Sequence, residues 1–112
     1  HLAAGKLVAL GITEAQGTPV APNIPTLAEQ GIQGVNVTSW YGLLAPAGTP
    51  AVVVEQLARD AADFLSQPEV KERLKAQGMT QNTMAPAAFA KYIKDETAVW
   101  AGVIQSRQIK AE

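Results

Sequence analysis

The stretch SWYGLLAPAGTP at residues 39–50 constrains the fold more than any other part of this chain. Its apolar residues, which continue as far as Ala45, predict a buried strand, and the PAG sequence that follows predicts a tight turn. Thr49 and Pro50 then predict a helix start, with threonine as the N-cap and proline at the first helical position. The stretch therefore predicts a strand that passes directly into a helix.

Further elements are predicted on both sides of this stretch. Residues 6–13 (KLVALGIT) are apolar on both faces, as is typical of a strand in a parallel sheet. Thr26 and Glu29 match the capping-box pattern of a short helix, which Gly31 would end. Three longer helices are expected at residues 50–66, from Pro68 to Gly78, and from Pro86 to about Arg107.

The order of these elements predicts an α/β fold, but one with an incomplete sheet. The segments at 6–13 and 35–45 are the two secure strand predictions, and residues 79–84 are a candidate for a third, short strand. A doubly wound domain needs more strands than these. The remainder of the sheet is expected to come from further sequence or from another copy of the chain.

Composition excludes several classes of function. Nine basic and ten acidic residues alternate without forming a block, so the basic stripe of a nucleic-acid-binding protein is missing. The chain has no cysteine, its one histidine is His1, and the sequence lacks a metal-ligand spacing. We therefore expect no catalytic residues, no metal and no cofactor. The sequence also has neither an apolar run long enough to span a bilayer nor a signal-peptide pattern at its start.

Trp40 and Tyr41 are the strongest candidates for contact with a ligand. Neighbouring residues of a strand point to opposite faces, so both rings can be buried only in a two-sided environment. Two interpretations stay open at this point. Both rings pack in a core, or one packs there while the other lines a cleft.

Four motifs together resemble one family of transport receptors: GKLVAL at 5–10, IPTLAEQG at 24–31, SWYGLLAPAGTP at 39–50, and SQPEVKERL at 66–74. The chain is similar to the C-terminal part of the Bug, or TctC-like, extracytoplasmic receptors of tripartite tricarboxylate transporters. That resemblance implies part of a two-lobed periplasmic-binding-protein (venus-flytrap) fold, with an incomplete sheet covered by helices. It assigns residues 1–37 to the remnant of the second lobe, 38–48 to a crossing hinge strand and turn, and 49–112 to the helical C-terminal part of the first lobe.

The resemblance also implies a function and a set of partners. A full-length receptor of this kind is a periplasmic protein, not an enzyme, that binds a small carboxylate or amino-acid-like solute and delivers it to membrane permease subunits. It suggests Thr13, Trp40 and Tyr41 as ligand-binding residues here. Relatives often carry a basic residue in the segment that reads EAQG at 14–17, and this sequence has none. The alternative expectation is a truncated, self-associating or partner-binding module that binds no solute.

Overall fold

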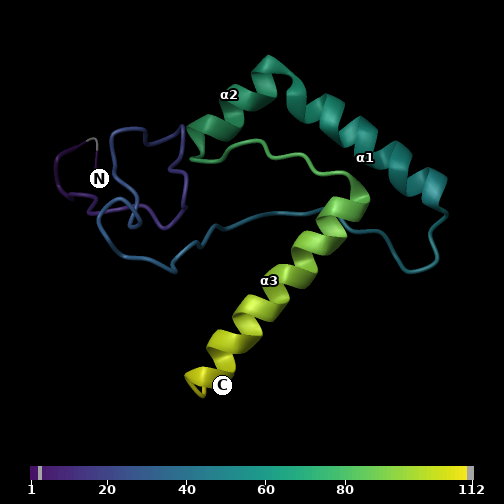
Figure 1. Cartoon of the computed structure of the whole chain (residues 1–112). Helices are drawn as coiled ribbons and strands as arrows, with labels where there is room; N and C mark the ends of the chain where they lie inside the picture. Colours follow the sequence, from purple (N-terminus) through teal and green to yellow (C-terminus); the bar gives the residue numbers. More distant parts are fainter. Residues whose placement is uncertain (3, 111–112) are drawn as a thin grey trace. The chain divides into compact units, whose positions relative to one another are not determined.

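A computed structural model describes residues 1–2 and 4–110, and its regular secondary structure consists of helices (Figure 1). Helix α1 spans Ala51–Ser66, α2 spans Pro68–Ala76, and α3 spans Pro86–Ser106. All three helices fall where the sequence predicts them, within about two residues at each end. Pro68 and Pro86 each occupy the first helical position, where the missing N–H has no intrahelical partner to lose.

The chain leaves α2 and α3 through the same hydrogen-bonded motif. After α2, Gly78 has a φ of 74°, and the Met79 N–H donates to the Leu74 carbonyl at 2.9 Å. After α3, Gln108 has a φ of 52°, and the Ile109 N–H donates to a carbonyl five residues earlier at 3.0 Å. Both are Schellman caps, and only the first has the glycine that this backbone conformation favours.

The start of α1 differs from the prediction. Thr49 does not cap the helix, because its hydroxyl donates to the Pro46 carbonyl at 2.8 Å, as does its backbone N–H at 3.2 Å. The predicted tight turn is confirmed, with Gly48 at a φ of 84°. Since the turn takes up the threonine side chain, the N-cap is Pro50, whose carbonyl accepts from the Val53 and Val54 N–H groups.

The predicted strands are absent from the described residues. One isolated parallel bridge joins Ile12 to Thr26, and the segments at 6–13 and 35–45 carry no strand. The first segment is not buried either, since Val8 is 83% exposed. Strands form when a neighbouring strand accepts their N–H and C=O groups, so an apolar pattern alone does not produce one. The α/β prediction therefore holds here only for its helices.

The predicted short helix at residues 26–31 is a turn that has the caps of a helix. The Thr26 N–H donates to Glu29 Oε2 at 2.7 Å, and the Glu29 N–H donates to Thr26 Oγ1 at 3.1 Å, so the capping box is present. Gly31 has the expected positive φ of 84°, and the Ile32 N–H closes the turn on the Leu27 carbonyl at 2.9 Å. The caps leave too few residues between them for an α-helix to propagate.

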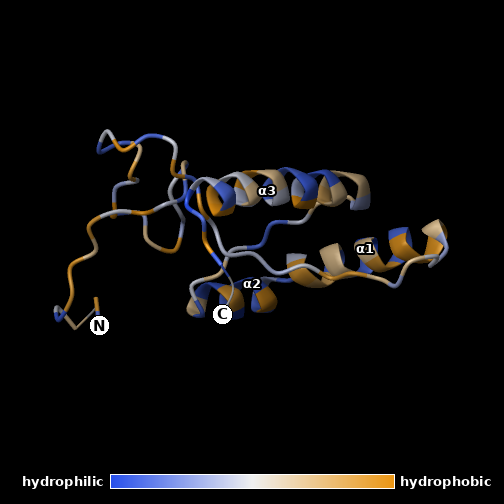
Figure 2. Cartoon of the chain, turned by 90° about the horizontal axis from the view of Figure 1, so that it is seen from below, coloured by the Kyte–Doolittle hydropathy of each residue, from blue (hydrophilic) through white to orange (hydrophobic). Residues whose placement is uncertain are grey.

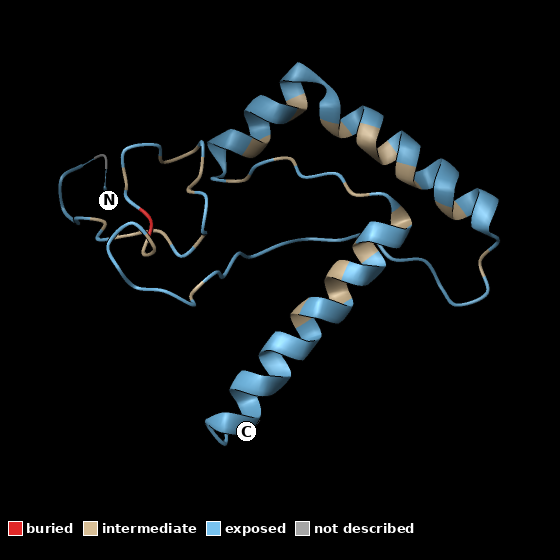
Figure 3. Cartoon of the chain, viewed as in Figure 1, coloured by how far each residue is buried: buried red, intermediate tan, exposed pale blue. Residues whose placement is uncertain are grey.

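No described apolar side chain is buried, and Thr26, at 4% exposed, is the one buried residue among those described (Figure 3). Apolar positions occur along every helix and along the first 50 residues (Figure 2). Burial of apolar surface drives folding, and the described residues do not form a hydrophobic core.

The chain divides into two compact units. The first comprises His1–Leu44 and Lys71–Thr80, and the second comprises Ala45–Val70 and Gln81–Glu112. Within the second unit α1 contacts α3. The polar contacts around Thr13 all lie in the first unit.

Candidate solute-binding site

Thr13 is tied to the chain segment that leads to Trp40 and Tyr41. Its hydroxyl donates to the Val37 carbonyl at 2.7 Å, and the Val37 N–H donates to the Thr13 carbonyl at 3.2 Å. The two residues are 24 positions apart, so these bonds hold two distant segments together. The first unit thus joins the segments that carry all three predicted ligand-binding residues.

Asn36, which no sequence motif marks, forms a second tie between the same segments. Its Oδ1 accepts the Ala15 N–H at 3.1 Å, across 21 residues. The signal available in the sequence was the tendency of asparagine side chains to bind backbone groups in loops. That tendency does not name the partner, which depends on how the loop after Thr13 folds back.

The segment before Thr13 is anchored from the other side by the turn at residues 26–31. The Ile12 N–H donates to the Pro25 carbonyl at 2.9 Å, and the Leu27 N–H donates to the Ile12 carbonyl at 2.8 Å. The Gln30 Nε2 group donates to the Leu10 carbonyl at 2.8 Å. Thr13 therefore stands between two sets of backbone contacts, which fix its position within the unit.

Trp40 and Tyr41 lie at the surface of the chain, so packing of both rings in a core of this chain is wrong. Trp40 is 41% exposed and Tyr41 is 88% exposed. An aromatic side chain contributes most when its ring is removed from water while its polar atom keeps a partner. Neither ring is fully removed from water in this chain, and Tyr41 is the more exposed of the two.

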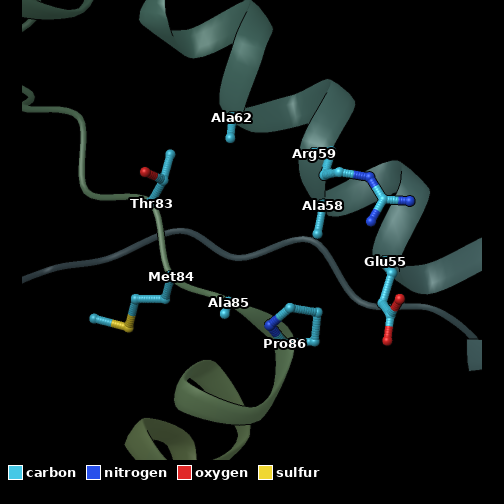
Figure 4. Close-up of a pocket in the computed structure, with 8 residues that line it drawn as sticks. All are labelled: Glu55, Ala58, Arg59, Ala62, Thr83, Met84, Ala85 and Pro86. Atoms are coloured by element: carbon cyan, nitrogen blue, oxygen red, sulfur yellow. The ribbon is translucent and has the colours of Figure 1, made fainter.

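A groove in the second unit is lined mostly by small or apolar residues (Figure 4). It has a volume of about 310 Å³ and lies between α1 and residues 83–86. Most of its lining is small or apolar: Ala58, Ala62, Met84, Ala85 and Pro86, together with Glu55, Arg59 and Thr83. The Arg59 guanidinium points away from Thr83 and Met84 in Figure 4, and it donates to Gln56 Oε1 at 3.1 Å. Solute sites need several converging polar groups, which this groove lacks, and none of the three predicted residues lines it.

Tyr92, on α3, has a pKa that departs from its ordinary value. Burial, and secondly the nearby Glu96 carboxylate, raise the pKa of Tyr92 above its ordinary value of 10.0, so this phenol stays neutral at physiological pH. Among the described residues, histidine, aspartate and glutamate do not gather into a group of three that could hold a metal ion. None of the described helices is long and apolar enough to cross a membrane.

Comparison with known proteins identifies the family. The family profile described as "Tripartite tricarboxylate transporter family receptor" matches residues 1–109. The chain belongs to this TctC family. Its members serve transport as receptors, which agrees with the resemblance of the four motifs.

Curated members of the TctC family are similar over nearly the whole of this chain. The UPF0065 protein in the tcbD-tcbE intergenic region of Pseudomonas sp. strain P51 is 36% identical over 112 residues, or 99% of this chain and 33% of that protein. Protein BugT of Bordetella pertussis is 32% identical over 110 residues, or 98% of this chain and 34% of BugT. The chain thus spans about a third of the length of these relatives.

A solved structure of a related receptor supports the same assignment. "R. palustris Rpa4515 with adipate" is 30% identical and matches with a TM-score of 0.72, over 93% of this chain and 35% of that chain. As its name states, that structure is one of Rpa4515 with adipate. The helices and turns of this chain therefore match part of the structure of a larger protein.

Proposed function

We propose that this chain contributes the C-terminal third of a periplasmic receptor that binds a small carboxylate and delivers it to the permease of a tripartite tricarboxylate transporter. The observation that carries the proposal is the TctC family match over residues 1–109. The presence of adipate, a dicarboxylate, in the related Rpa4515 structure supports the class of solute. Within such a receptor, residues 1–37 would belong to the second lobe, 38–48 to a crossing segment, and 49–112 to the first lobe.

The three candidate residues suit different parts of a carboxylate solute. Tyr41 offers a hydroxyl donor for a carboxylate oxygen, and the bond would be strengthened by the charge on its acceptor. The Trp40 indole ring suits the methylene groups of an aliphatic dicarboxylate. The hydroxyl group of Thr13 already donates its one hydrogen bond to the Val37 carbonyl. Its contribution to solute binding is therefore to hold the loop after it in place. Binding requires no charged side chain in this arrangement, consistent with the absence of a basic residue at 14–17.

The test is a chimera in which this chain replaces the third of Rpa4515 that it matches. Calorimetry with adipate and a panel of shorter and longer dicarboxylates measures solute affinity. We expect binding of at least one member of the panel, weakened roughly 10- to 150-fold by Tyr41→Phe, since a hydrogen bond to a charged group contributes about 1.5–3 kcal/mol. Lys94→Ala, on the polar side of α3, is the matched control and should leave the affinity unchanged. A chimera that folds and binds no dicarboxylate, while unaltered Rpa4515 binds adipate, refutes the proposal.

The isolated chain provides a second test. It lacks the polypeptide that makes up about two thirds of its relatives, and most contacts of a bound solute would be missing with it. We therefore expect the purified 112-residue chain to bind dicarboxylates weakly or not at all. Binding at micromolar affinity by the monomeric chain would contradict the proposed division of the site.

A further inference from the structure

The fold fixes the orientation of the Asn36 side-chain amide. A backbone N–H can only donate, so the Asn36 atom that faces the Ala15 N–H at 3.1 Å has to be the amide oxygen, Oδ1. Oδ1 and Nδ2 belong to one planar group, and a flip that exchanged them would set two donors against each other. The bond to Ala15 therefore decides where the Nδ2 donors lie.

These Nδ2 donors are not used within the chain. Among the residues that the structure describes, the bond from the Ala15 N–H is the one hydrogen bond of the Asn36 side chain, which is exposed. Two glutamines of the same unit are arranged in the opposite way. The Nε2 group of Gln30 donates to the Leu10 carbonyl at 2.8 Å, and that of Gln33 donates to the Ala28 carbonyl at 3.2 Å. Asn36 thus keeps its donors for an acceptor from outside.

The Nδ2 donors lie beside the contacts that hold the candidate site together. Asn36 immediately precedes Val37, whose carbonyl accepts the Thr13 hydroxyl at 2.7 Å. Its oxygen binds the segment at 14–17, which directly follows Thr13 and has Glu14 as its one charged residue. A carboxylate that reaches this segment meets no cation there, so neutral donors have to hold it. An amide N–H is such a donor, and a hydrogen bond to an ionised acceptor is stronger than one between neutral groups.

We infer that Asn36 serves the solute site through both polar atoms of its amide: Oδ1 holds the loop after Thr13, and Nδ2 donates to a carboxylate oxygen of the solute. The inference rests on the proposed function and adds to it a residue that contacts the solute. Since Nδ2 can only donate, the contact favours a carboxylate and disfavours an ammonium group at the same place. One side chain thereby joins the order of the loop to the recognition of the solute.

The experiment uses the chimera with Rpa4515, with adipate and the same dicarboxylate panel as probes. Asn36→Ala removes both polar atoms, whereas Asn36→Asp keeps the acceptor for Ala15 and removes the donor. Gln33→Ala is the matched control, because it deletes a side-chain amide whose nitrogen is already bonded to the Ala28 carbonyl. Calorimetry measures the affinity, and hydrogen exchange of the Ala15 amide reports whether the loop is still held.

We expect Asn36→Ala and Asn36→Asp to weaken binding roughly 10- to 150-fold, the effect of losing a hydrogen bond to a charged group. The Ala15 amide should stay protected in Asn36→Asp, which separates the contact with the solute from the support of the loop. Gln33→Ala should leave the affinity unchanged. In the unaltered chimera, the NMR signals of the Asn36 side-chain amide should move when the dicarboxylate is added, while those of Gln33 stay in place.

Two results overturn the inference. Asn36→Asp binds as tightly as the unaltered chimera while Ala15 stays protected, which would limit Asn36 to holding the loop. Alternatively, the Asn36 amide signals do not move although the dicarboxylate binds. A failure of the proposed function is recognised separately, because the unaltered chimera then binds no dicarboxylate and the inference falls with it.

Discussion

Replacement of Gly11 by alanine tests whether the turn at residues 26–31 anchors the segment that leads into Thr13. A Cβ atom at position 11 would lie 2.7 Å from Gln30 Nε2 and 2.7 Å from Leu27 Cδ2, closer than such atoms approach in real structures. Both neighbours are ends of flexible side chains, so the backbone can stay while they move. The glutamine amide would then leave the Leu10 and Thr26 carbonyls, to which it donates at 2.8 Å and 3.3 Å.

The expected magnitude follows from these contacts. Two partly exposed hydrogen bonds contribute roughly 0.5–1 kcal/mol each, and a displaced leucine rotamer costs about 0.5–1.5 kcal/mol. The reduced entropy of the unfolded chain returns about 0.4–1 kcal/mol, since alanine is stiffer than glycine. Gly11→Ala should therefore destabilise the contact between the two segments by about 1–2 kcal/mol, a factor of roughly 5–30 in the opening equilibrium.

Amide hydrogen exchange of Ile12 and Leu27, the two residues whose N–H groups close the bridge, measures this opening. A double-mutant cycle with Gln30→Ala provides the control. Since Gly11→Ala already expels the Gln30 amide, the double variant should lose about 1 kcal/mol less than the sum of the single variants. Additivity within about 0.3 kcal/mol would mean that Gln30 keeps its bonds in the alanine variant, which refutes the reasoning.

Three further predictions concern local contacts. Gln108→Gly should stabilise the end of α3 by about 0.5–1 kcal/mol, because Gln108 holds a φ of 52° that glycine adopts without a Cβ penalty. Slower hydrogen exchange of the Ile109 amide checks this prediction. An equal gain in stability from Gln108→Ala would contradict it. Asn36→Ala should speed exchange of the Ala15 amide several-fold by removing its acceptor, whereas Asn36→Asp keeps an acceptor and should protect it. Burial and the Glu96 carboxylate raise the pKa of Tyr92 above 10.0, so Tyr92 should contribute stability that is fully present below pH 10 and lost as the pH rises further. In an absorbance titration of the phenol, Glu96→Gln should lower the midpoint toward 10. An unchanged midpoint would mean that Glu96 has no effect on the pKa of Tyr92.

The helices could be predicted from the sequence because the signals that start and end them are local. Proline at positions 68 and 86 and glycine at position 78 act through neighbouring backbone groups, and the helices begin and end within two residues of the predicted bounds. The same locality explains the capping box between Thr26 and Glu29, although too few residues follow it for a helix. The error at Thr49 arose because a second local motif, the preceding turn, competes for the same hydroxyl group.

The candidate site was predictable only in its residue types. The sequence drew attention to Thr13, Trp40 and Tyr41, but the bonds that tie Thr13 to Val37 and Ala15 to Asn36 join residues more than 20 positions apart. No local pattern names such a partner.

The sequence by itself determined where helices form, which family the chain resembles, and which chemistry its composition excludes. Only the tertiary structure decided that residues 6–13 and 35–45 form no strand, that Trp40 and Tyr41 stay at the surface, and that the second half of α3 keeps its apolar side chains exposed. The physical reason is the range of the interactions. A helix closes its hydrogen bonds within four residues, whereas a strand and a hydrophobic core depend on contacts with residues that are distant in the sequence.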